Sequence, residues 1–208
     1  PRTQSAFLEA MQERSVTADG TTHALPGPFM VLATQNPVEQ KGTFPLPEAQ
    51  LDRFLLRVSM GYPSEAEEVQ MLQRFRAGDP LLQIQPVADA AELPGLREQV
   101  RDVHVADDLA RYVVALAAAT RETPALRLGA SPRSSLALLH AAQAWAALDG
   151  RAFVTPDDVQ RLVAPVLAHR LLLSREASLA QRDSVAVLDE LVAGVPVPAE
   201  AADEPPAG

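Results

Sequence analysis

The chain has 208 residues, a formal net charge of −9 and no cysteine, so disulfides, cysteine-ligated zinc and thiol nucleophiles are excluded. An acidic chain is poorly suited to neutralising phosphates or anionic lipid, which argues against nucleic acid as a partner. No apolar run is long enough to cross a membrane, so we expect no stable membrane insertion and a cytoplasmic location.

The first two predicted elements are a helix and a hairpin. Residues 3–13 carry apolar side chains at helical spacing. This helix is already under way close to Pro1, so we expect the natural N-terminus to lie upstream. Residues 16–23 place Asp19 and Gly20 between two β-prone runs. That arrangement predicts a hairpin, because a two-residue turn needs residues that accept a positive φ.

Two apolar runs further along the chain have no polar alternation. They cover residues 29–33 and 54–58, and a short helical stretch around 47–52 lies between them. Runs of this kind predict strands that are covered on both faces, as in a parallel sheet. The first 60 or so residues are therefore interpreted as the end of an α/β layer.

After Pro63 the pattern becomes helical. Ser64 and Glu67 have the spacing of a capping box, which predicts a helix that begins at this point. A second amphipathic helix is predicted because four apolar residues fall on one helical face. These are Leu109, Tyr112, Val113 and Leu116.

The remaining predicted helices complete a bundle. Residues 134–148 are apolar nearly all round, so this helix is expected to be buried at the centre. Thr155 is the predicted N-cap of the next helix, which Pro165 should kink or end. A last helix is predicted over 183–193, and the tail 196–208, rich in Pro, Ala and acidic residues, is expected to be disordered.

Three residues are candidates for chemistry. Asn36 follows the first predicted strand, on the side of an α/β sheet where ligands bind, although Asn36 followed by proline also fits a simple turn. Arg53 could act on a phosphate, but a surface salt bridge with Asp52 or Glu48 would equally explain it. Arg133 lies in the first turn of a predicted helix, where arginine is unfavourable unless an anion is nearby.

Three blocks in close order together resemble the core of a MoxR-type AAA+ ATPase. The blocks are TQSAFLEAMQER (3–14), ATQNP (33–37) and FPLPEAQLDRF (44–54), and the similarity extends through GYP (61–63), GASPR (129–133) and HRL (169–171). The resemblance implies the C-terminal part of the parallel sheet of an AAA+ P-loop NTPase, followed by an all-helical lid domain. Its expected units are residues 1–62, a lid over 63–195 and a tail over 196–208.

The resemblance also implies roles for single residues. Asn36 matches sensor 1, which holds the attacking water and reports on the γ-phosphate of ATP. Arg53 matches the arginine finger, which reaches the nucleotide of the neighbouring subunit, and Arg133 matches sensor 2, which contacts the nucleotide of its own subunit. Residues 16–23 resemble the hairpin that points toward the pore of the ring. The implied cofactors are ATP and Mg²⁺.

The printed sequence contains no phosphate-binding loop of the Gly-Lys-Ser/Thr type. Lys41 is the only lysine, and Gln40 precedes it. The resemblance places the principal Mg²⁺ ligands upstream as well, so we expect no metal-ligating residue here and no ATP turnover by the chain alone.

The four histidines show no spacing typical of a metal site. His140 lies on an apolar helix, so it is expected to be a hydrogen-bonded core residue. The others are His23, His104 and His169.

Three classes of function are compatible with these features. The resemblance favours a chaperone-like ATPase that acts as a hexameric homo-oligomer with a von Willebrand factor A-domain protein and matures, or inserts cofactors into, partner proteins. The alternative within AAA+ is a helicase or a metal-chelatase motor subunit. A hairpin that tracks DNA should carry Lys or Arg, and residues 16–23 carry neither. The third class is a nucleotide-independent interaction module made of the helical part.

Overall fold

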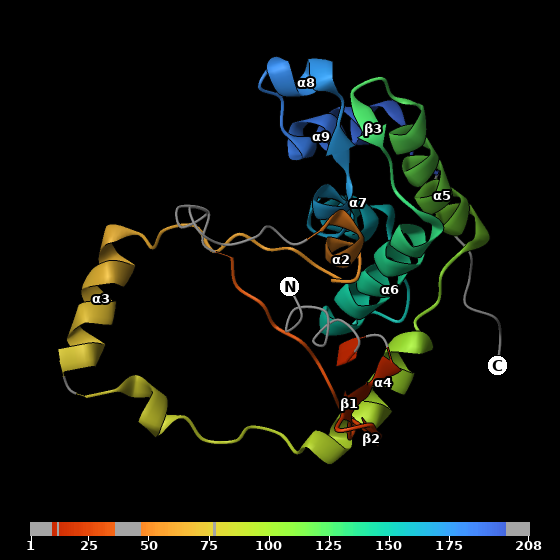
Figure 1. The fold of residues 1–208 in the computed structure, drawn as a ribbon. Coiled ribbons are helices and arrows are strands. Elements are labelled where there is room, and N and C mark those ends of the chain that lie inside the picture. Colours follow the sequence, from red (N-terminus) through yellow and green to blue (C-terminus); the bar gives the residue numbers. More distant parts are fainter. Residues whose placement is uncertain (1–9, 12, 36–46, 77, 199–208) are drawn as a thin grey trace.

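The computed structural model describes residues 10–11, 13–35, 47–76 and 78–198 (Figure 1). Among these residues, the main apolar core lies entirely between Val103 and Leu188. The described residues 58–92, which come before α4 (Leu93–Arg101), follow an open path outside the packed helices (Figure 1). The predicted helix over 3–13 falls largely outside the described part of the chain, as do Asn36 and most of the predicted disordered tail.

The predicted hairpin is confirmed. Strand β1 (Ser15–Ala18) pairs antiparallel with β2 (Thr21–Ala24). The turn residues Asp19 and Gly20 have φ values of 50° and 79°. Both values are positive, as the common two-residue hairpin turns with the right twist require.

The strands predicted over 29–33 and 54–58 are not present. Helix α2 (Glu48–Leu51) forms between them as expected, but neither segment has strand structure. In the described residues the two sheets are antiparallel pairs, β1 with β2 and β3 with β4. Met30 and Leu32 are 72% and 83% exposed. These apolar runs lack the neighbouring strands that would bond their backbone and cover both of their faces.

Helix α3 (Glu65–Arg76) begins at the predicted capping box. The Ser64 backbone N–H donates to the Glu67 carboxylate at 2.8 Å, and the Glu67 N–H donates to the Ser64 hydroxyl at 3.4 Å. The helix buries none of its side chains. Two short 3₁₀ turns follow, η1 (Pro80–Gln83) and η2 (Ala90–Glu92).

The packed part of the chain is a bundle with one small sheet. Helix α6 (Pro132–Leu148) packs against α7 (Pro156–Leu167), α5 (Asp107–Glu122) and α4 (Figure 1). The four apolar residues predicted to share a face of α5 are all buried. The expectation of an all-helical unit needs one correction, because β3 (Leu126–Leu128) pairs with β4 (Leu172–Leu173).

Helix α6 is buried on one face rather than all round. Its covered face is rich in alanine, which allows close approach of the neighbouring helices. Leu136 and Leu148 are 57% and 86% exposed. His140 is also exposed, so its predicted place in the core is wrong. These three residues are on the part of the helix surface that the described residues leave exposed.

The last helices begin as their sequences predict. Thr155 caps α7, since its hydroxyl accepts from the Asp158 N–H, and the Asp158 carboxylate accepts from the Thr155 N–H at 2.8 Å. Pro165 lies inside α7, which ends two residues later and continues as the 3₁₀ turn η3 (Ala168–Arg170). Helix α8 (Arg175–Leu179) and helix α9 (Ser184–Gly194) follow. None of the described helices combines the length and apolarity that a membrane crossing requires.

Candidate functional site

The three sequence-predicted site residues have different positions. Asn36 lies outside the described residues. Arg53 directly follows α2 and is partly buried, whereas Arg133 is exposed in the first turn of α6. The surroundings of these two arginines therefore define the part of the site that the structure describes.

The start of α6 is held against the end of α5. A Cβ atom added to Gly129 would lie 2.6 Å from the carbonyl oxygen of Thr120 and 2.8 Å from Cα of Arg121. Only glycine allows this approach without a shift of the backbone. The Ala130 N–H donates to the Thr120 hydroxyl at 2.8 Å, and its carbonyl accepts from Nε of Arg121 at 2.7 Å.

A capping box then fixes the first turn of α6. The Ser134 N–H donates to the Ser131 hydroxyl at 3.4 Å, and the Ser131 N–H donates to the Ser134 hydroxyl at 3.1 Å. Pro132 occupies the first turn, where its missing N–H has no cost. Arg133 therefore stands at the N-terminus of a 17-residue helix. Its positive charge is unfavourable there by itself, and an anion such as a phosphate would relieve this.

The segment around Arg53 docks onto the turn η3. The carbonyl oxygen of Phe54 accepts hydrogen bonds from Nε2 of His169 at 2.9 Å and from Nη2 of Arg170 at 2.8 Å. Nε of Arg170 lies 3.6 Å from Oδ1 of Asp52. Neither His169 nor Arg170 is among the sequence-predicted site residues, although both lie in the HRL motif (169–171). Their contact with Phe54 spans more than a hundred residues, so local spacing carried no signal for it.

Burial lowers the pKa of both His169 and Arg170. The pKa of His169 is lowered mainly by burial, and the bond with Phe54 opposes this shift. A carbonyl only accepts, so Nε2 of His169 carries the hydrogen in a neutral ring. The pKa of Arg170 is also lowered by burial, Asp52 opposes this, and the charge of Arg133 lowers it further. Arg170 itself contacts the segment of Arg53 through Phe54 and Asp52.

The arrangement suits an anion better than a metal ion. Arg133 at the helix N-terminus fits a phosphate group. Within the described ranges there is no group of three or more His, Asp or Glu residues that could hold a metal. The described residues therefore do not fit Mg²⁺, and no step of the chemistry is assigned to it here.

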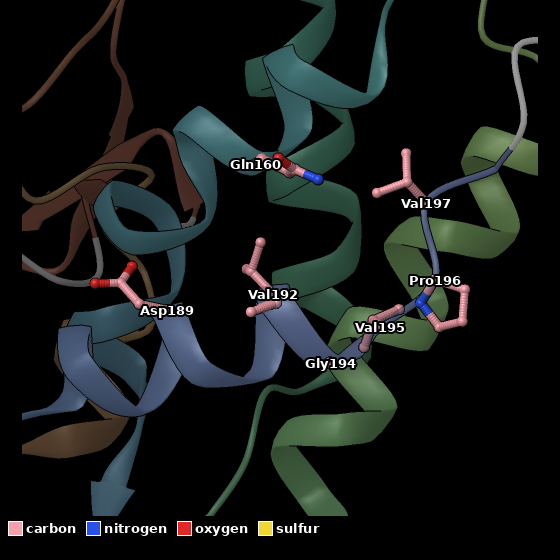
Figure 2. A pocket seen from close by; sticks show the side chains of 8 residues that line it. Gln160, Asp189, Val192, Gly194, Val195, Pro196 and Val197 are labelled. Carbon is pink, nitrogen blue, oxygen red and sulfur yellow. The ribbon is translucent and has the colours of Figure 1, made fainter.

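A separate open pocket lies beside the end of α9 (Figure 2). Gln160 reaches it from α7 and donates to the Tyr112 hydroxyl at 3.0 Å. Asp189 is the one charged residue of the lining, so the pocket does not suit an anionic nucleotide. The lining consists of Gln160, Asp189 and residues 192–197.

Two parts of the chain match profiles of known protein families. Residues 1–56 match the profile of the ATPase family associated with various cellular activities (AAA), and residues 118–191 match that of the AAA lid domain. The chain also superposes on the crystal structure of a "putative ATPase" from Cytophaga hutchinsonii with a TM-score of 0.88 and 33% identity. The alignment covers 95% of this chain and 63% of that protein, which confirms the expected fold class.

The chain is also similar in sequence to several bacterial proteins, and some of these are named MoxR. The chain is 46% identical to the uncharacterized protein YeaC of Bacillus subtilis, over 96% of this chain and 62% of that protein. It is 39% identical to the chaperone MoxR1 of Mycobacterium tuberculosis, over 95% of this chain and 54% of that protein. The chain thus spans just over half of the length of these relatives. Together with the two profile matches, these similarities show that the chain belongs to the MoxR-type AAA+ ATPase family.

Proposed function

We propose that this chain is the sensor and lid part of a ring-forming, chaperone-like ATPase that uses ATP and Mg²⁺ to remodel partner proteins. The observation that carries the proposal is the position of Arg133, a cation held at the N-terminus of α6 by Gly129, Ala130 and Ser131. Such a position is favourable only when it faces an anion. The name of the relative MoxR1 supports a chaperone role.

The proposal gives three residues different roles in ATP hydrolysis. Asn36 positions the attacking water in its own subunit, and Arg133 contacts the nucleotide of the same subunit. Arg53 reaches the nucleotide of the neighbouring subunit. Phosphoryl transfer spreads negative charge over the γ-phosphate oxygens, and a forked guanidinium that is always charged suits this task better than an ammonium group.

The proposed organisation follows the family. Residues 1–62 would belong to the α/β core, 63–195 to the lid and 196–208 to a tail, with the phosphate-binding loop and the Mg²⁺ ligands encoded upstream. The ring would be a cytoplasmic hexamer that cooperates with a von Willebrand factor A-domain protein. The 208-residue chain alone would not turn over ATP, since its single lysine is outside a Gly-Lys-Ser/Thr motif.

The alternative is that the chain belongs to a helicase or a metal-chelatase motor subunit, in which the same sensor and finger positions would serve. The hairpin of β1 and β2 argues against DNA tracking, because residues 15–24 contain neither Lys nor Arg. An interaction module that needs no nucleotide is the remaining alternative. Assembly of the complete protein into rings that depend on ATP would exclude this last possibility.

The decisive experiment asks whether Arg53 acts on a neighbour. Arg53→Ala in the complete ATPase is mixed with a variant that lacks the phosphate-loop lysine, each inactive alone. Rings containing both should regain ATP turnover, because an intact phosphate loop then faces an intact Arg53. No recovery in rings shown to have exchanged subunits would mean that Arg53 is instead a structural arginine. Arg111→Ala is the matched control, since Arg111 pairs with Asp108 at the surface of the lid.

A further inference from the structure

The backbone directly after Arg53 is tied to the lid at one atom. The Phe54 carbonyl oxygen accepts two hydrogen bonds, from His169 and Arg170 at 2.9 and 2.8 Å. A third bond lies nearby, because the Arg57 N–H donates to the carbonyl of Pro165 at 2.9 Å. The segment 54–57 thus runs along the end of α7 and the turn η3.

The ion pair at this contact is poorly explained by stability alone. The Arg170 side chain is only 3% exposed, and its Nε and Nη1 atoms are buried without a hydrogen-bond partner. Nε lies 3.6 Å from the Asp52 carboxylate, which is too far for a hydrogen bond. Replacing a buried ion pair by apolar residues of similar volume is often neutral or stabilising. A buried arginine at this place therefore suggests a role beyond stability.

Arg170 contacts residues on both sides of Arg53. It contacts Phe54 and Asp52, which flank Arg53. Burial lowers the pKa of Arg170, and the charge of Arg133 lowers it further. An anion bound at Arg133 would screen this repulsion. The bond from Arg170 to Phe54 joins the lid turn η3 directly to the backbone beside Arg53, and such a direct contact is what a coupling between lid and finger requires.

We propose that His169 and Arg170, here called the lid latch, are positioning residues for Arg53. They hold the peptide that follows Arg53 to the lid, so that a movement of the lid on nucleotide binding also moves the finger. Nucleotide bound in one subunit would in this way determine the position of Arg53 at the nucleotide site of the neighbouring subunit. The inference rests on the proposed role of Arg53 in the adjacent site.

The test uses Arg170→Met in the complete ATPase. Methionine fills a similar volume but cannot donate to Phe54, so the fold should persist while the finger loses its anchor. Turnover should fall at least tenfold, and the ATP affinity should stay within about twofold of wild type. Arg170→Lys keeps a charged donor and should restore part of the turnover.

The mixing experiment separates positioning of the finger from a structural defect. If Arg170 acts through Arg53, Arg170→Met should regain turnover in rings with the phosphate-loop lysine variant, as Arg53→Ala does. If Arg53→Ala regains turnover and Arg170→Met does not, Arg170 serves its own subunit and the lid latch proposal is wrong. If neither variant recovers, the proposed role of Arg53 itself is wrong.

A matched control tests lid stability. Arg151→Met removes another buried ion pair of the lid, between Arg151 and Asp158, without touching residues 52–54. Hydrogen exchange of residues 54–57 should become faster in Arg170→Met and stay at wild-type rates in Arg151→Met. Equal exchange in the two variants, or loss of turnover in both in proportion to their melting temperatures, would contradict the proposal.

Discussion

The carbonyl oxygen of Phe54 accepts a hydrogen bond from Nη2 of Arg170 at 2.8 Å across a sequence separation of 116 residues. This bond joins the residue after the proposed arginine finger to the turn η3, which follows the lid helix α7. The predictions that follow test this contact, the start of α6 and the ion pair of the lid.

Arg133→Ala should weaken nucleotide binding or uncouple it from lid movement in the complete ATPase. The substitution removes the cation at the N-terminus of α6 while the capping box of Ser131 and Ser134 stays intact. The fold should therefore be unchanged by circular dichroism and melting temperature. The affinity is measured by titration with a fluorescent ATP analogue. If affinity, turnover and lid position all match wild type, Arg133 is a surface residue only.

Gly129→Ala should destabilise the lid by about 1–3 kcal/mol, a cost typical of overpacking. The added Cβ would lie 2.6 Å from the Thr120 carbonyl oxygen, and its three nearest neighbours are backbone atoms of Thr120 and Arg121, so no flexible side chain can move away. Urea unfolding measures the effect. Gly95→Ala is the control, because Gly95 lies in α4 and an added Cβ there meets nothing within 4 Å. It should be neutral or slightly stabilising, since alanine favours helix. Equal loss at both positions would contradict the close contact.

Asp158→Ala should cost about 2–3 kcal/mol, somewhat below the 3–5 kcal/mol for a fully buried pair because Arg151 is partly exposed. The carboxylate is 5% exposed, binds Arg151 at 2.6 Å and also caps α7 through the Thr155 N–H. Urea unfolding gives the free energy. Asp108→Ala removes the exposed pair with Arg111 and should cost less than about 1 kcal/mol. Similar values for the two substitutions would show that the buried pair adds nothing.

The contribution of the ion pair between Asp158 and Arg151 to the free energy of unfolding should also be lost at acidic pH. Burial raises the pKa of Asp158, but the hydrogen bonds from Arg151 and Thr155 outweigh it, so the pKa lies below its ordinary value. In the unfolded chain the carboxyl binds protons first, so this contribution to stability is present above about pH 4 and is lost as the pH falls through the folded pKa. The slope of the free energy of unfolding against pH below 4 should be smaller in Asp158→Asn. An unchanged slope would contradict this.

His169 should make the stability of the chain depend on pH near neutrality. Burial lowers its pKa, and the charges that face it are those of Arg170, Arg57 and Asp52. The unfolded imidazole titrates at about 6.5, so the unfolded state binds more protons just below this pH. The free energy of unfolding should therefore fall as the pH drops from about 7 toward the folded pKa. His169→Gln should reduce this slope. Between about pH 7.5 and 8.5 the histidine of wild type is neutral in both the folded and the unfolded state, so the difference in stability between the variant and wild type should stay constant there. A slope identical to wild type would contradict the prediction.

Much of the local structure could be read from the sequence, because it depends on residues within four positions of each other. The turn at Asp19 and Gly20 has the expected positive φ values, and Ser64 and Thr155 cap the helices that they were predicted to cap. The stripe of apolar residues on α5 is buried as its spacing indicates. The motifs around Arg53 and Arg133 also identified the family before any contact was known.

Tertiary structure decided what depends on partners that are distant in the chain. Apolar runs over 29–33 and 54–58 have a strand-like composition, yet strand formation needs a bonded neighbour, and none of the described residues provides one. His140 and the covered face of α6 could not be assigned from composition, because an apolar helix does not show which of its faces a neighbour will occupy. The contact of Phe54 with His169 and Arg170 needed the whole lid to fold, since the backbone carbonyl that receives both donors carries no signature in the sequence.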